Sequence, residues 1–165
     1  MIESQGEKMK KILILIGVIL SFMGCNPSGV VSEGNIKKAL DVAYAETKDY
    51  EYKGYNANES FMFIKMYLKD KRYHNHMECM VLDESDVEGK KSVRSCIFPN
   101  GSPDGETPFG SENILVKAIP GRENKDLVAL VFFADAEKTE KGVRFSTIMP
   151  IGIAVNLQTR KIGEL

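Results

Sequence analysis

Two histidines and one glutamate at alternate positions form a candidate set of metal ligands in this chain. His74, His76 and Glu78 are spaced by two residues, so on a β-strand their side chains would share one face. Imidazole and carboxylate groups arranged in this way can bind Zn²⁺ or Cu²⁺. Met80 and Leu82 would continue the same face, however, and the chain holds only 2 His. The pattern equally fits the polar half of a partly exposed strand, and we predict no bound metal.

Two further patterns come close to known chemical motifs without completing them. Acidic residues at 84, 86 and 88 before Gly89 match the start of a Ca²⁺ loop, but Ser95 stands where that loop needs a bidentate Glu. Ser102 lies between Gly101 and Gly105, one place too early for a nucleophile elbow, and a Pro follows it. No Gly-rich phosphate loop is present either. We therefore predict that the chain is not an enzyme.

A helix is expected to precede a series of strands. Ile36, Leu40 and Ala43 recur at helical spacing, and Ser32 or Asn35 can cap a helix over about 35–48. Alternating side chains predict a strand over 61–68, and a Pro- and Gly-rich loop is expected over 99–112. The other expected strands cover 74–82, 92–98, 114–119, 127–134, 143–149 and 151–157.

The segment 127–134 is apolar at every position. Such a run is typical of a strand buried on both faces or of a short buried helix, and its Val and Phe content favours the strand. The predicted fold class is α+β, with one N-terminal helix followed by about six mostly antiparallel strands in a curled sheet or partial barrel. One helix can cover only one face of that sheet. The other face then needs the sheet to curl, a C-terminal segment or a partner.

The N-terminus has the pattern of a secretory signal peptide. Lys8, Lys10 and Lys11 precede an uncharged apolar run over 12–24, which is the expected order of a basic region and a hydrophobic region. This run is shorter than the roughly 20 residues that a membrane-spanning helix needs. Met9 is an alternative start, because acidic residues before it weaken the basic region.

The four residues Phe22-Met23-Gly24-Cys25 resemble the lipobox of bacterial lipoproteins. The resemblance implies that residues 1–24 are removed, and that Cys25 then carries diacylglycerol and a further acyl chain as its only added groups. It implies a protein of the bacterial cell envelope that faces the periplasm. Asn26 in place of Asp favours the outer membrane over the inner membrane in a Gram-negative host. Residues 25–34 would form the lipidated cysteine and its tether, and 35–165 a single domain.

Two cysteines remain once Cys25 is lipidated. Cys79 and Cys96 form an even pair, and the compartment implied by the lipobox is oxidising. We predict a disulfide between them, with two free buried thiols as the alternative. The bridge would close a loop worth about 3 kcal/mol of chain entropy. It would also place residue 82 opposite residue 93 across a hairpin.

Charge and tyrosine content bear on the partner. With 22 Lys+Arg against 23 Asp+Glu, the net charge of −1 argues against a nucleic-acid binder that works by bulk charge. Tyr50, Tyr52 and Tyr55 cluster after the predicted helix, and tyrosine favours protein interfaces, although this stretch can equally pack on the core. We expect a membrane-anchored, non-catalytic module that binds a protein, as an inhibitor, an immunity protein or an accessory of an envelope assembly. The alternatives are an envelope enzyme or small-ligand or metal binder, and a structural lipoprotein that associates with itself through its sheet edges.

Overall fold

The computed structural model describes residues 29–54, 58–86, 89–99, 113–134, 137–140, 142–144 and 150–164. The predicted signal peptide, the predicted lipidation site Cys25, Tyr55, residues 100–112 of the predicted loop and residues 145–149 of the strand predicted over 143–149 lie outside these ranges. Within the described residues, no helix is long and apolar enough to cross a membrane.

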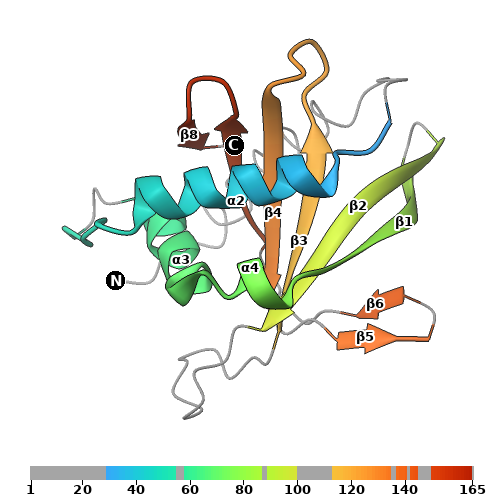
Figure 1. Ribbon diagram of the computed structural model, residues 1–165, viewed down its shortest axis with the longest axis horizontal. Helices are drawn as coiled ribbons and strands as arrows, with labels where there is room; N and C mark the ends of the chain where they lie inside the picture. Colours follow the sequence, from blue (N-terminus) through green and yellow to red (C-terminus); the bar gives the residue numbers. More distant parts are fainter. Residues whose placement is uncertain are drawn as a thin grey trace, which may run out of the picture.

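The first described helix, α2, spans Glu33–Thr47 and confirms the helix predicted over 35–48. It begins where the side chain of Ser32 accepts a hydrogen bond from the backbone N–H of Asn35 at 3.2 Å, which satisfies one of the free donors of the first turn. Its apolar stripe includes Ile36 and Leu40, both fully buried. The helix crosses one face of the sheet, where it contacts β4, β7 and β8 (Figure 1).

The sheet has six strands in the order β1-β2-β3-β4-β7-β8, and all neighbouring strands are antiparallel. Their bounds are Glu78–Asp86, Gly89–Pro99, Asn113–Pro120, Leu127–Ala134, Ile151–Asn156 and Lys161–Glu164. A separate hairpin joins β5 (Glu137–Thr139) and β6 (Gly142–Arg144). The α+β class is confirmed, and the sheet is open, with β1 and β8 as its edges among the described strands.

The prediction of a strand over 61–68 is wrong, because α3 spans Glu59–Tyr67. Almost every position of this segment is apolar, so it satisfies the period of a strand and the period of a helix alike. The side chain of Asn58 decides the outcome locally, since it accepts a hydrogen bond from the N–H of Phe61 at 3.1 Å. Asn58 followed by the acidic Glu59 is a typical start of a helix, and the alternating side chains over 61–68 led to a strand being predicted in its place.

The strand predicted over 74–82 begins later than expected. A short 3-10 turn, η1 (Lys69–Lys71), and a single helical turn, α4 (Tyr73–His76), precede β1. The described chain therefore has α2, α3 and α4 where one helix was predicted. In Figure 1 all three lie on the same face of the sheet.

The strand β4 is buried on both faces, as its uniform apolar sequence predicted. Val128, Leu130 and Phe132 belong to the large core under the helices. Ala129 and Val131 alternate with them, lie on the opposite face and are also buried. On that opposite face, the apolar side chains gather in two smaller clusters that share a contact with Phe133.

Candidate functional site

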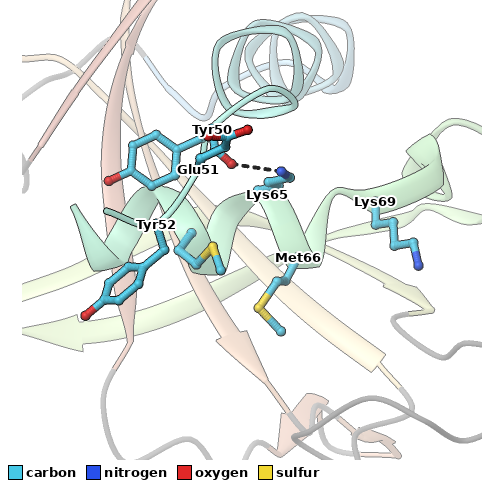
Figure 2. A pocket seen from close by; sticks show the side chains of 7 residues that line it. Tyr50, Glu51, Tyr52, Lys65, Met66 and Lys69 are labelled. Carbon is cyan, nitrogen blue, oxygen red and sulfur yellow. Dashed lines mark hydrogen bonds between the residues drawn. The ribbon is translucent and has the colours of Figure 1, made fainter. Parts of the chain in front are cut away.

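A groove lies between α3 and the chain segment that follows α2 (Figure 2). Its volume is about 390 Å³, and we call it the α3 groove. Residues from both elements line it: Tyr50, Glu51, Tyr52, Met62, Lys65, Met66 and Lys69. Four of these residues come from α3 and the turn after it: Met62, Lys65, Met66 and Lys69. Their spacing of three, one and three positions places them on one helical face. The opposite face of α3 carries the buried Ile64 and Tyr67.

Tyr50 is held in place by three contacts to the beginning and middle of α3. Its hydroxyl accepts a hydrogen bond from the backbone N–H of Asn58 at 2.6 Å, and its carbonyl accepts one from Lys65 Nζ at 2.8 Å (Figure 2). Its ring meets Phe61 edge-on, with the ring centroids 5.8 Å apart. Tyr50 therefore forms a fixed wall of the α3 groove, and it fastens the segment after α2 to α3.

Tyr52 differs from Tyr50 in being 49% exposed, although it is a large apolar residue. It lines the α3 groove together with the half-buried Met62 and Met66. Tyrosine and methionine are enriched at the centres of protein interfaces, and the flexible thioether chain of Met adapts to irregular partner surfaces. The seven lining residues are two Tyr, two Met, two Lys and one Glu. The α3 groove therefore combines aromatic and thioether side chains with charged ones.

The structure places the predicted Tyr cluster in two settings. Tyr50 packs against Phe61, whereas Tyr52 is exposed. Tyr55 lies outside the described residues. The contribution of α3 was missed, because a strand over 61–68 would have placed Met62, Ile64 and Met66 together on one face.

A second cluster joins α2 to α4 through Asp41. The hydroxyl of the buried Tyr73 donates a hydrogen bond to Asp41 Oδ1 at 2.9 Å, and His74 Nε2 lies 2.5 Å from the same oxygen. Burial, followed by the hydrogen bond to Asp41, raises the pKa of Tyr73 far above its usual value. Lys37 Nζ donates a further hydrogen bond to the carbonyl of His74 at 3.3 Å. An Asp–His pair can support acid–base chemistry, but here its contacts fix α4 against α2.

The three candidate metal ligands do not meet on one strand face. His74 lies in α4 against Asp41, His76 is exposed at the end of the same turn, and Glu78 opens β1. The alternation assumed for these residues fails because residues 73–76 are helical. Within the part of the chain that the structure describes, no group of three His, Cys, Asp or Glu side chains could hold a metal ion.

The acidic segment around Glu84 forms a hairpin of β1 and β2 in place of a Ca²⁺ loop. Asp86 lies opposite Gly89, and Leu82 lies opposite Val93 as predicted. The carboxylate of Glu84 contacts the ammonium of Lys117 on β3, and both side chains are largely buried. Lys117 Nζ also lies 5.3 Å from the ring centroid of Phe133. Glu84 is thus paired within the sheet.

The predicted disulfide is present. Cys79 and Cys96 lie directly opposite each other on β1 and β2, with a Cα–Cα distance of 4.1 Å and an S–S distance of 2.06 Å. Cys96 is fully buried in the core beneath the helices. The bridge therefore ties the edge strand β1 to the interior of the sheet.

Comparison of the chain with protein-family models, with curated proteins and with solved structures gives no match.

Proposed function

We propose that this chain is a lipid-anchored protein of the bacterial cell envelope whose folded part binds another protein through the α3 groove and has no catalytic role. In this proposal the partner is an enzyme that the chain inhibits or neutralises, or a component of an envelope assembly that it serves. The observation that carries the proposal is the exposed Tyr52, which lines one groove with the half-buried Met62 and Met66 and with a rigidly held Tyr50.

The rigidity of the groove wall favours binding. A partner that docks against Tyr50 need not order that side chain, because two hydrogen bonds and a ring contact already hold it. Tyr52 and the two methionines supply apolar area that water covers in the free protein. Lys65 and Lys69 also line the groove, and protein interfaces commonly combine an apolar centre with polar groups around it.

The signal-peptide pattern and the lipobox resemblance support the cellular setting of this proposal. An anchor with two or more acyl chains holds a protein stably at a membrane, and the residues between Cys25 and α2 act as a short tether in this reading. The partner would then be a protein of the same envelope compartment.

The experiment uses the full chain, purified in a mild detergent, as bait for envelope extracts of the organism that encodes it. We expect wild-type protein to retain one protein at a fixed ratio. Tyr52→Ala should weaken that retention by about thirtyfold, the loss typical of an interface hot-spot tyrosine. Gln158→Ala is the matched control, because Gln158 is also exposed but lies in the turn between β7 and β8.

Two results would contradict the proposal. Equal retention by wild type and Tyr52→Ala would remove the α3 groove as the binding surface. Failure of wild-type bait to retain any protein would remove partner binding itself. Capture of an enzyme, followed by inhibition of its activity on titration with the chain, would identify the inhibitor or immunity role.

A further inference from the structure

Among the described strands, β1 forms a long edge of the six-stranded sheet. It spans nine residues, Glu78–Asp86, and pairs with β2 over its whole length in a continuous register. It is an edge of the six-stranded sheet, with β2 as its one neighbour among the described strands. Natural edge strands are commonly protected by charged side chains, especially Lys, by Pro, by a bulge or by short length. β1 has no Lys or Pro, its pairing shows no bulge, and its charged side chains are all acidic.

The backbone groups that face this edge can be assigned from the pairing. The short Cα–Cα distance of 4.1 Å between Cys79 and Cys96 is typical of a non-hydrogen-bonded antiparallel pair. Residues in such pairs direct their N–H and C=O groups away from the neighbouring strand. Because this orientation alternates along the strand, the backbone groups of Val81, Asp83 and Ser85 face outward as those of Cys79 do. The side chains of residues 81, 83 and 85 are exposed, and that of Val81 is 48% exposed.

The charge of β1 selects the kind of strand that can add to this edge. Its ionisable residues are Glu78, Asp83, Glu84 and Asp86, and no basic residue lies on it. Glu84 is paired with Lys117, whereas the described partner of Asp83 is the neutral hydroxyl of Ser92, at 2.7 Å. On the same face of the sheet, Arg94 and Lys90 of β2 lie opposite Val81 and Ser85, so Asp83 is the group on this face of β1 that attracts a cation. A positively charged side chain directly beside Asp83 would be favourable, because oppositely charged neighbours stabilise adjacent strands.

A second copy of the chain fits this edge poorly. If two β1 strands paired antiparallel along their whole length, with Leu82 opposite Leu82, Glu78 of each copy would stand opposite Asp86 of the other. Val81 would then face Asp83 in both halves of the pair. Like charges directly opposite each other destabilise a sheet. In this register the acidic residues of β1 therefore disfavour self-pairing, and the carboxylate of Asp83 favours a basic partner strand.

We propose that the outer edge of β1 binds an extended, basic segment of a partner protein by strand addition, with its backbone bonded to Val81 and Asp83. In this mode the main chain supplies most of the affinity and alternate side chains supply the selectivity. The site is separate from the α3 groove, which lies on the helical layer. It does not depend on the function proposed for that groove.

The test uses the full chain in a non-ionic detergent and two synthetic peptides. One alternates Lys and Val over the length of β1, and the other alternates Glu and Val. Backbone hydrogen exchange measured by NMR should slow about tenfold at Val81 and Asp83 when the Lys–Val peptide is added, since those amides gain a partner. The amides of Met80 and Leu82, which already face β2, should change by less than about twofold. The Glu–Val peptide should leave all four amides unchanged.

Variants of β1 separate backbone pairing from side-chain contact. Val81→Pro removes an outward N–H without removing a hydrogen bond to β2, and it should abolish the protection of Asp83 by the Lys–Val peptide. Val81→Thr keeps the N–H and the β-branched shape, and it should behave as wild type. Asp83→Lys gives a second test if the proline variant does not fold, and it should weaken peptide binding by about tenfold.

Four results would overturn the proposal: no protection by the Lys–Val peptide, equal protection by both peptides, or unchanged protection in Val81→Pro or in Asp83→Lys. Protection that rises with protein concentration in the absence of peptide would show that a second copy occupies the edge, and would also overturn it. Tyr52→Ala should leave the peptide response intact. That comparison keeps failure at the edge distinguishable from failure at the α3 groove.

Discussion

Asp41 is the residue on which the position of α4 depends. It accepts a hydrogen bond from the hydroxyl of Tyr73 and lies against His74, so one carboxylate holds two neighbouring side chains of the same turn. Tyr73 is fully buried, and its ring meets Phe98 edge-on with the ring centroids 5.9 Å apart. Because a hydrogen bond to a charged group contributes about 1.5 kcal/mol or more, Tyr73→Phe should lower the free energy of unfolding by about that amount.

The same residue predicts a dependence of stability on pH. The pKa of Tyr73 is raised in the folded state by burial and by its hydrogen bond to Asp41, so its stabilising contribution is complete below the ordinary tyrosine pKa of about 10. Above that pH unfolding releases a proton, and the free energy of unfolding should fall by about 1.4 kcal/mol per pH unit. Denaturant unfolding measured from about pH 8 to pH 11 should show this additional slope only above about pH 10, in wild type and not in Tyr73→Phe. Parallel pH curves for the two proteins would contradict it.

At the scale of elements, α3 can be tested directly, because a helix and the predicted strand over 61–68 give different stabilities for two alanine variants. On the predicted strand, Ile64 and Met66 would share one face and would contribute alike. On the helix, Ile64 is fully buried while Met66 lines the α3 groove. Ile64→Ala should therefore lower the free energy of unfolding by about 2–5 kcal/mol, and Met66→Ala by less than about 1 kcal/mol. Similar losses for both variants, measured by chemical unfolding, would contradict the helix.

The elements that the sequence predicted correctly share a clear period or a strong boundary. The helix over 33–47 has a capping serine and a buried stripe, and β4 is apolar throughout and sits at the centre of the sheet. The disulfide was predicted from the even cysteine pair and the oxidising compartment that the lipobox resemblance implies, and the register of Leu82 opposite Val93 followed from the bridge. β8 was missed because it is only four residues long and contains Gly163. Its turn depends on the side chain of Asn156, which accepts hydrogen bonds from two backbone N–H groups.

The candidate sites could be predicted only in part, for a physical reason. Tyr52 was selected by residue type, but its exposure depends on how α3 packs beside it, and the period of α3 was ambiguous. The position of β1 at an edge depends on the order of strands in the sheet. Strand order arises from long-range pairing, and a local pattern of side chains does not encode it. Both surfaces therefore became visible only with the tertiary arrangement.

At the scale of the whole molecule, the two candidate surfaces occupy different parts of the fold. The α3 groove is built from α3 and the end of the segment after α2, whereas the open edge belongs to β1 (Figure 1). The disulfide ties that edge strand to the core. A partner could engage either surface without displacing the core, because both are formed by side chains or backbone groups already directed outward.

The proposed anchor determines where such partners are met, and it predicts a specific covalent state. If Cys25 is lipidated, the chain isolated from bacterial membranes should begin at Cys25 and carry the mass of a diacylglyceryl group plus an acyl chain. One acyl chain gives only marginal membrane binding, so two or three are needed for stable retention. In Cys25→Ser the thiol that accepts the lipid is lost. Intact-mass spectrometry should then find no lipid and an N-terminus that retains the residues before position 25.

Ser28→Ala is the control for this change, because it alters the same tether and leaves the thiol in place. It should keep both the lipid mass and the N-terminus at residue 25. Detergent-phase partitioning would give a second readout, with wild type and Ser28→Ala in the detergent phase. Wild-type protein that carries no lipid, or whose N-terminus lies elsewhere, would remove the anchor and leave the two binding surfaces to be tested without it. The protein experiments on Tyr52 and β1 do not require lipidation, so their results would still stand.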